Sequence, residues 1–272
     1  MNDGYTFASM MLEYTSSDFA IGQFALQALN NKDDASYFIN RSQNWKNIYN
    51  PKIKWLNSRY PSGKWKDIKH DWREATHKNY FWMVPYNLKG LIDTLGGSKS
   101  AVKRLNTFFE RLDASYDDDW FAAGNEPDFQ APWIYNWTDS PFKTSEVIHR
   151  VFNEMYTSEP TGLPGNDDLG TMGAWYVFAS VGIYPMIPGV AGFSVSLPQF
   201  EKVTVNLPQG ILTINGGSTE NYYIKSLKIN GKQYMSTWVD WDLINNGGTI
   251  DFESSNTPNK SWGENTEPPS FN

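Results

Sequence analysis

The stretch GNDDLGTMGAWYVFASVGIYPMIPG, residues 165–189, marks a change of pattern in this 272-residue chain. Its long aromatic and apolar run predicts a helix from about Asp167 to Val181, and Pro185 stops the run. Upstream of this stretch the apolar side chains recur at helical spacing, whereas downstream they alternate with polar ones. The stretch therefore divides a helical part of the chain from a strand-forming part.

The downstream part carries the signature of a small antiparallel sheet domain. FSVSLPQFEKVTVNL, GILTING, YYIKSLKINGKQY and GGTIDFES alternate apolar and polar side chains with period two, and Asn230-Gly231 is a strong hairpin turn signal. We expect the β domain to cover residues 190–262. The polar, proline-containing end over residues 263–272 is expected to be a flexible tail.

The upstream part, residues 1–189, is expected to consist of antiparallel helical hairpins with long functional loops on one side. The long segment PKIKWLNSRYPSGKW between the second and third helices is punctuated by proline and glycine and is predicted to be irregular. The first two predicted helices cover residues 8–29 and 33–50. A third runs from near Tyr80 to a C-cap at Gly96 and Gly97. A fourth starts at a cap at Ser98 or Ser100, and a fifth starts at a cap at Thr144.

Composition excludes several classes of function. A formal net charge of -7 and no basic patch argue against nucleic acid as a partner. No window approaches the length of a membrane span, and the N-terminus lacks the layout of a signal peptide, so we expect no membrane partner. The absence of cysteine excludes disulfides and thiolate chemistry, and fits a bacterial cytoplasm as well as a secreted protein. The compartment therefore stays open.

Aromatic residues make up 16% of the chain, with 12 Trp and 15 Tyr. A large core accounts for part of this content, because aromatic rings bury much apolar surface. Trp and Tyr also form the flat platforms on which sugar rings stack. Composition alone leaves both explanations open.

Asp167 and Asp168 allow two explanations that are compatible. With Asn166 as N-cap, the two carboxylates would complement the positive end of the helix dipole, which stabilises a helix by about 0.3 to 1 kcal/mol each. The same field lowers the pKa of a carboxylate and keeps it ionised, as a general base that activates water requires. Spacing alone favours capping.

The loop GNEPDFQAPWIYNW, residues 124–137, is a second candidate. Asn125 and Glu126 lie between glycine and proline, which favours a simple turn. Two oxygen-bearing side chains in a rigid loop, followed by aromatic rings, would also suit a hard cation such as calcium beside a sugar site. The acidic run of residues 117–119 lacks the spacing of a calcium loop and is expected to be solvated.

The segment DWREATHKNYFWMVPYN, residues 71–87, holds the third candidate. Glu74 precedes many aromatic residues, and an apolar environment would raise its pKa towards the range of a general acid. The alternative is an ordinary ion pair with Arg73 or Lys78. His77 has no partners for a catalytic triad or a histidine metal site, because the chain contains only three His and no Cys. Carboxylate chemistry is the favoured interpretation.

Taken in order, several of these motifs resemble one family. REATHKNYFWMVPYNLKGLI, GNEPDFQAPWIYNW, GNDDLGTMGAWYVFASVGIYPMIPG and the β segment YYIKSLKINGKQY resemble the C-terminal half of glycoside hydrolase family 92, the calcium-dependent exo-acting α-mannosidases. EYTSSDFAIGQFA and NRSQNWKNIYNP are similar to its earlier barrel helices. The resemblance implies an α+β chain, an incomplete (α/α)6-barrel-type helical domain followed by the small β domain. The N-terminal β-sandwich of the family would be missing from this chain.

The resemblance also implies a mechanism. Family members invert the anomeric centre, with an acid and a base about 6.5 to 9.5 Å apart. By position, Glu74 matches the general acid and Asp168 the general base, with Asp167 beside it. Asn125 and Glu126 match the loop near the calcium ion and the substrate, and the calcium ion would be a cofactor.

Three further residues are expected to contact a mannose-containing oligosaccharide. Phe129 and Gln130 occupy positions where members that prefer α-1,2 linkages tend to carry His and Glu, so stacking plus one hydrogen bond is expected there, and α-1,2 linkages are less favoured. Trp82 lies in the same segment as Glu74. The alternatives to a bacterial α-mannosidase are a carbohydrate-binding protein without catalysis and a helical scaffold.

Overall fold

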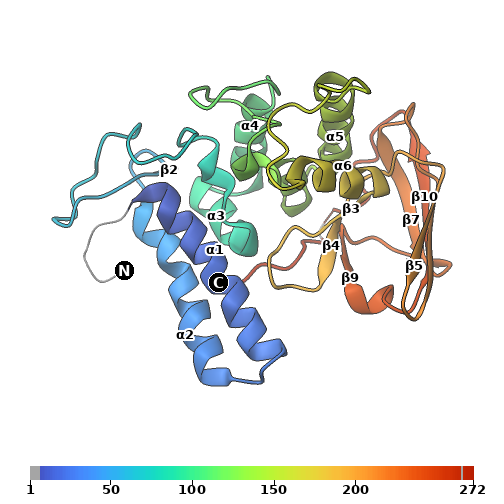
Figure 1. Cartoon of the computed structure of the whole chain (residues 1–272), viewed down its shortest axis with the longest axis horizontal. Coiled ribbons are helices and arrows are strands. Elements are labelled where there is room, and N and C mark those ends of the chain that lie inside the picture. Colours follow the sequence, from blue (N-terminus) through green and yellow to red (C-terminus); the bar gives the residue numbers. More distant parts are fainter. Residues whose placement is uncertain (1–6, 265) are drawn as a thin grey trace. The chain divides into compact units, whose positions relative to one another are not determined.

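The computed structural model describes residues 7–264 and 266–272. These residues form two compact units (Figure 1). The first contains the chain up to Gln130 together with Ile187–Val190 and Ser270–Asn272, and the second contains Ala131–Met186 and Ala191–Pro269. The predicted division by secondary structure at residue 189 therefore differs from the division into units, because helices and strands share the second unit.

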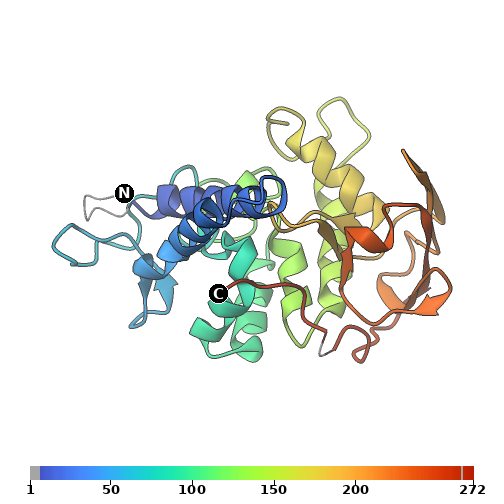
Figure 2. The same ribbon diagram turned by 90° about the horizontal axis from the view of Figure 1, so that it is seen from below.

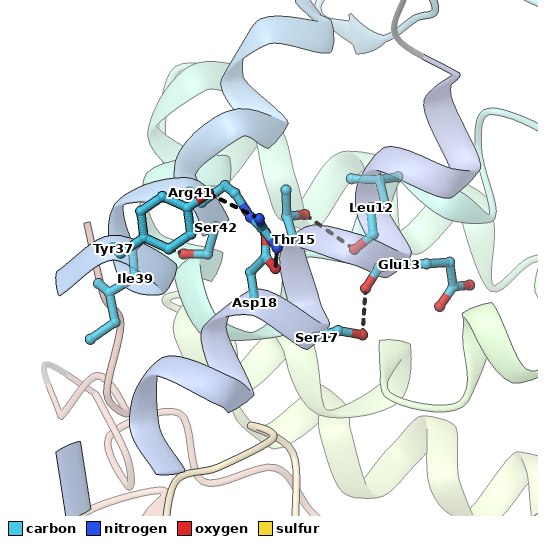
Figure 3. Close-up of polar contacts among 9 residues, drawn as sticks. All are labelled: Leu12, Glu13, Thr15, Ser17, Asp18, Tyr37, Ile39, Arg41 and Ser42. Carbon is cyan, nitrogen blue, oxygen red and sulfur yellow. Dashed lines mark hydrogen bonds and ion pairs between the residues drawn. The ribbon is translucent and has the colours of Figure 1, made fainter. Parts of the chain in front are cut away.

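The first unit begins with a helical hairpin, α1 (Ala8–Gln27) and α2 (Lys32–Ser42), whose helices lie side by side in both views (Figures 1 and 2). Arg41 on α2 donates two hydrogen bonds to the carboxylate of Asp18 on α1, from Nε at 2.7 Å and from Nη2 at 2.5 Å (Figure 3). This buried carboxylate keeps the pKa of Arg41 above its usual range through hydrogen bonding. The pair fixes the register of the two helices.

After α2 the first unit is built from short elements around an irregular segment. The predicted helix over residues 33–50 ends early, at Ser42, and continues as a 3-10 turn and a two-residue strand. The helix predicted from near Tyr80 begins later, because two 3-10 turns come first and the α-helix starts only at Leu88. The elements are η1 (Gln43–Ile48), β1 (Tyr49–Asn50) paired with β2 (Trp55–Leu56), η2 (Tyr80–Trp82), η3 (Pro85–Asn87), α3 (Leu88–Leu95), α4 (Ser98–Phe108) and η4 (Glu126–Asp128).

The second unit combines helices with two sheets. Its helical elements are η5 (Ala131–Trp137), α5 (Phe142–Met155), α6 (Thr171–Val181) and η6 (Trp241–Leu243). One sheet has the order β3-β4-β9, formed by Ile183–Tyr184, Gly192–Val195 and Trp238–Asp240. The other has the order β5-β6-β10-β7-β8, formed by Lys202–Leu207, Gly210–Asn215, Gly248–Ser255, Tyr223–Ile229 and Lys232–Gln233.

The sheets confirm the predicted α+β class. Asn230 and Gly231 both have positive φ and join β7 to β8 in a tight hairpin, as their sequence predicted. Inward-facing residues of the larger sheet form a continuous apolar core that includes Leu212, Ile214 and Leu227. One detail differs from the antiparallel expectation, since β6 and β10 pair in parallel.

Two of the predicted helix N-caps are wrong here. Gly97, rather than Ser98 or Ser100, is the N-cap of α4. Helix α5 begins two residues before Thr144, and the Thr144 hydroxyl donates instead to Asn136 Oδ1 at 2.9 Å. The predicted C-cap at Gly96 is confirmed by its left-handed conformation.

The end of the chain also differs from the predicted flexible tail. The Phe271 backbone N–H donates to the Tyr86 carbonyl at 2.8 Å, and the Phe271 ring lies 4.9 Å from the ring of Phe19. The Gln43 side chain donates to the Phe271 carbonyl at 3.2 Å. These contacts tie the last residues to the first unit. Across the described residues, no helix is both long and apolar enough to cross a membrane.

Candidate active site

Glu74 lies in an irregular segment with a left-handed backbone, φ 51°. A residue with a Cβ atom adopts this conformation at a cost of about 1–2 kcal/mol, so the surrounding structure must hold it there. Part of that support comes from Asn125, whose buried side-chain amide donates to the Glu74 carbonyl at 2.9 Å. The two sequence-predicted loops therefore meet at this hydrogen bond.

The Glu74 carboxylate differs from the expected apolar setting. Its side chain is 56% exposed, and Arg73 Nη2 lies 3.2 Å from Glu74 Oε1. Lys78, the other partner considered from sequence, pairs with Asp119 at 2.8 Å. His77 is neutral over a wide pH range, because burial lowers its pKa to about 4. Glu74 therefore presents an accessible carboxylate from a constrained backbone.

The buried carboxylate of Asp128 accepts hydrogen bonds that support the loop of Asn125 and Glu126. Asp128 Oδ2 accepts hydrogen bonds from the Ala122 N–H at 2.8 Å and from Asn79 Nδ2 at 3.0 Å, while Oδ1 has no partner in the described residues. Asn79 Oδ1 in turn accepts from the N–H and the hydroxyl of Thr76. This network joins the loop of Glu126 to the segment that carries Glu74. Burial raises the pKa of Asp128 to about 7.

The charges of three carboxylates act on the phenol of Tyr80. Burial raises the pKa of Tyr80 above its usual range, and the negative charges of Glu13, Glu74 and Glu126 add to this effect. Tyr80 Oη donates to Glu13 Oε1 at 3.4 Å, and desolvation raises the pKa of Glu13 as well. Glu13 points away from Asp18 of the same helix and from its partner Arg41 on α2 (Figure 3). Sequence reasoning missed Glu13, because a single glutamate in a helix is usually a solvated residue.

Asn125 and Glu126 are compatible with part of a calcium shell. The Asn125 amide is oriented by its bond to Glu74, which leaves Oδ1 as the oxygen that can face a ligand. Calcium takes about six to eight oxygen ligands. No group of three or more His, Cys, Asp or Glu side chains in residues 7–264 and 266–272 is placed to hold a metal ion. Asn125 and Glu126 would thus supply only a minority of the ligands.

The other carboxylate pair, Asp167 and Asp168, belongs to the second unit. Helix α6 begins at Thr171 instead of near Asp167, because Asp168, Leu169 and Gly170 all have positive φ. Asn166 is therefore not the N-cap. Asp167 still satisfies the start of the helix from outside it, since its Oδ1 accepts from the Gly173 N–H at 3.0 Å.

Asp168 has a different role from its neighbour. Its side chain is exposed and makes no capping bond, while its carbonyl accepts from the Thr171 hydroxyl at 2.5 Å. Its φ of 41° again places a non-glycine residue in the left-handed region. Of the two carboxylates that the sequence assigned to capping, only Asp167 therefore bonds to the start of the helix, while both side chains are exposed.

Aromatic rings pack on one another in the second unit, which also contains Asp167 and Asp168. Tyr156 stacks on Trp175 with centroids 5.8 Å apart, and Trp133 stacks on Tyr184 at 4.0 Å. Burial raises the pKa of Tyr156, with a smaller contribution from the charge of Asp167. The high aromatic content therefore serves core packing here, the first of the two explanations left open by composition.

The other three residues predicted to bind substrate differ in how accessible their side chains are. Phe129 is 5% exposed, which leaves little ring surface for a sugar, so its stacking role has no support here. Gln130 is partly exposed and its amide donates to the Pro127 carbonyl at 2.8 Å. Trp82 is 1% exposed, and its accessible part lines a cavity.

The family model described as the glycosyl hydrolase family 92 catalytic domain matches residues 2–256. The chain belongs to this family. A solved family 92 α-mannosidase from Bacteroides thetaiotaomicron is similar to this chain at 30% identity with a TM-score of 0.90, over 98% of this chain and 38% of its own. An inverting family 92 mannosidase from the same species shows 25% identity and a TM-score of 0.87, over 97% of this chain and 40% of its own.

A curated relative of this family 92 chain has the name "uncharacterized secreted glycosidase" and comes from Arthroderma benhamiae. It is 28% identical, over 97% of this chain and 37% of its own length. The family 92 chain thus spans about two fifths of the proteins it resembles. The pairing of Glu74 with Asp168 stays a prediction, because the two residues belong to different units.

Proposed function

We propose that this family 92 chain acts in an exo-acting, inverting, calcium-dependent α-mannosidase that releases mannose from α-mannosides. Family membership supports glycoside hydrolysis, and the names of the solved relatives support mannose, one of them in complex with mannoimidazole. The observation that carries the assignment within this chain is that both candidate carboxylates, Glu74 and Asp168, are exposed on backbones held in the left-handed region.

In the proposed reaction, Glu74 donates its proton to the glycosidic oxygen as the bond to the mannose anomeric carbon breaks. Asp168 removes a proton from a water molecule, whose oxygen attacks that carbon from the opposite face. The product is mannose with inverted configuration, and the carboxyls would be about 6.5 to 9.5 Å apart. Asn125 fixes the backbone of the acid, and Asp167 anchors the turn that carries the base.

Calcium, when bound, would polarise sugar hydroxyls and help to hold the distorted ring. Asn125 Oδ1 and the carboxylate of Glu126 are the oxygens proposed to hold it, with the remaining ligands drawn from water and the sugar. In an active enzyme that contains this chain, removal of calcium with EDTA should therefore abolish the hydrolysis of α-mannosides, and added calcium should restore it.

We propose further that the chain works together with an additional N-terminal part of the kind that the family resemblance implies. The relatives are more than twice as long as the matched region. A row of large apolar side chains on α1 is exposed in this structure, including Met10, Tyr14 and Phe24. Such a patch fits contact with further protein. The 272-residue chain alone is therefore expected to hydrolyse α-mannosides weakly or not at all.

A chimera tests the function directly. In the Bacteroides thetaiotaomicron α-mannosidase, the matched region would be replaced by this chain, and circular dichroism would establish folding. The chimera should release mannose. Glu74→Gln should lower kcat by about 10²–10⁴-fold on an unactivated mannoside. The same substitution should lower kcat much less on a substrate with an acidic leaving group, because such a group needs no protonation.

Asp168→Asn should lower kcat on both substrates, because water activation is needed in each case. Glu110→Gln changes an exposed carboxylate of the same unit as Glu74 and serves as the matched control with unchanged activity. A folded chimera that binds mannose without hydrolysing it would instead support a non-catalytic carbohydrate-binding protein. Equal activity of Glu74→Gln and Glu110→Gln would remove Glu74 from the mechanism.

A further inference from the structure

A cavity of about 320 Å³ lies in the first unit. Helix α4 forms one side of it, and Trp55 of β2 and Trp82 of η2 form another. None of Glu74, Asn125 and Glu126 lines it. The volume falls within the range of about 300–1,000 Å³ that is typical of small-molecule sites.

The cavity carries positive charge in a chain of net charge -7. Lys78, Lys103 and Arg104 line it, against the single carboxylate of Asp119. Lys78 neutralises Asp119 through an ion pair at 2.8 Å. The charges of Lys103 and Arg104 are therefore left for a ligand. Lys103 is exposed and makes no ion pair with a residue that the structure describes.

Arg104 is the group that most requires a partner. Its guanidinium lies 3.6 Å from the centroid of the Trp55 ring and 4.5 Å from that of Phe81, and Nη1 donates to the Lys54 carbonyl at 2.8 Å. No other hydrogen bond to Arg104 occurs within the described ranges, so most of its N–H groups have no protein acceptor. Desolvation lowers the pKa of Arg104 to about 10, which leaves it charged at neutral pH.

A held, partly desolvated guanidinium with spare N–H groups binds planar or tetrahedral oxyanions well, because its fork matches carboxylate and phosphate oxygens. The rest of the lining suits the body of a sugar. The half-buried Trp55 offers apolar surface to ring C–H groups, and the exposed hydroxyls of Ser100 and Thr107 offer hydrogen bonds to ring hydroxyls. The cations and the ring-binding surface lie in one cavity.

We propose that this cavity binds an anionic monosaccharide, a hexose that carries a phosphate or a carboxylate group. Of the residues assigned to the proposed mannosidase site, only Trp82, predicted to contact the substrate, also lines this cavity. Its ligand contacts Lys103 and Arg104 through the anion and Trp55 through the ring. The proposal does not depend on hydrolysis, because binding alone tests it.

The test is calorimetric titration of the 272-residue chain with mannose 6-phosphate, glucuronate, methyl α-mannoside and inorganic phosphate. At least one anionic sugar should bind at least about tenfold more tightly than the neutral mannoside and than inorganic phosphate. The tighter of the two anionic sugars identifies the charged group. The indole N–H resonances of Trp55 and Trp82, assigned by Phe substitution, should shift on binding. Equal affinity for the neutral mannoside, equal affinity for inorganic phosphate, or no binding of either anionic sugar would overturn the proposal.

Charge reversal locates the site. Lys103→Glu should weaken binding of the anionic sugar by about tenfold or more, since an attraction becomes a repulsion at the cavity wall. Lys99→Glu is the matched control, because Lys99 is an exposed lysine on the same helix that does not line the cavity. It should change affinity by less than about twofold. Equal effects of the two reversals would show a diffuse charge effect and would sink the proposed site.

Discussion

Both candidate catalytic residues store backbone strain at single positions. A glycine would adopt the φ of 51° at residue 74 freely, whereas the Cβ of glutamate makes it unfavourable. The family resemblance gave Glu74 the role of general acid, which stays a prediction, but the sequence carried no signal for this conformation, because left-handed backbone is expected at Gly and Asn. Gly96 and the Asn230-Gly231 turn, where such residues occur, were predicted correctly.

Strain at residue 74 predicts that a glycine variant is more stable than an alanine variant there, the reverse of the usual order. Glu74→Gly should be about 1 kcal/mol more stable than Glu74→Ala, because both remove the carboxylate and only alanine keeps the Cβ in the left-handed region. Urea unfolding of the chain measures the difference. At Ser17, an exposed position within α1, the same pair should show alanine as the more stable by about 1 kcal/mol. The same order at both positions would contradict strain at residue 74.

Asp128 predicts a pH dependence of stability. Its pKa is about 7 in the folded chain and about 3.9 when unfolded, so the folded state binds the proton more tightly between these values. The contribution to stability is therefore fully present below pH 3.9 and is lost as the pH rises through 7. Between pH 5 and pH 8 the wild type should lose about 2–3 kcal/mol more than Asp128→Asn does.

Asp128→Asn is a fair comparison, because an asparagine oxygen can still accept from Ala122 and Asn79. All other titrating groups are shared by the two proteins, and the difference between their unfolding curves isolates residue 128. Urea unfolding at the two pH values makes the measurement. Equal losses of unfolding free energy in the two proteins would show that ionisation of Asp128 does not destabilise the folded chain.

At the scale of elements, periodicity predicted the helices better than their ends. Apolar spacing located α1, α5 and α6, since a buried face imposes the helical period. The start of α6 was placed four residues early, because the left-handed turn over residues 168–170 interrupts a sequence that reads as a capped helix. Alternation predicted the strands, but not the parallel pairing of β6 with β10, because period two is the same in either direction.

The α1–α2 hairpin depends on close approach at Gly22. A Cβ atom there would lie 2.7 Å from Ile39 Cγ1 and 3.1 Å from the Ile39 backbone nitrogen. Alanine favours helix by about 1 kcal/mol over glycine, yet the clash should dominate and Gly22→Ala should destabilise the chain by about 1–3 kcal/mol in urea unfolding. Adding Ile39→Ala should recover part of this loss, whereas an additive double mutant would place the clash elsewhere.

At the scale of the whole molecule, the first unit is assembled from three separate parts of the sequence. Its last part, Ser270–Asn272, contributes the Phe271 ring to Phe19 and a backbone hydrogen bond to Tyr86. Composition predicted a flexible tail here, since polar residues and prolines show no periodic pattern. One aromatic side chain with a partner distant in sequence is invisible to such reasoning.

These contacts predict that the end of the chain stabilises the first unit selectively. Phe271→Ala should cost about 1–3 kcal/mol, because the ring is only partly buried, while the exposed Asn272→Ala should change stability by less than about 0.5 kcal/mol. In hydrogen exchange, Phe271→Ala should reduce protection of the amides of α1 and α3. The amides of β7 and β10 in the second unit should keep theirs, since they share no contact with Phe271. Equal loss of protection in both units would mean that they unfold together, and no loss in either would mean that the Phe271 contacts contribute nothing.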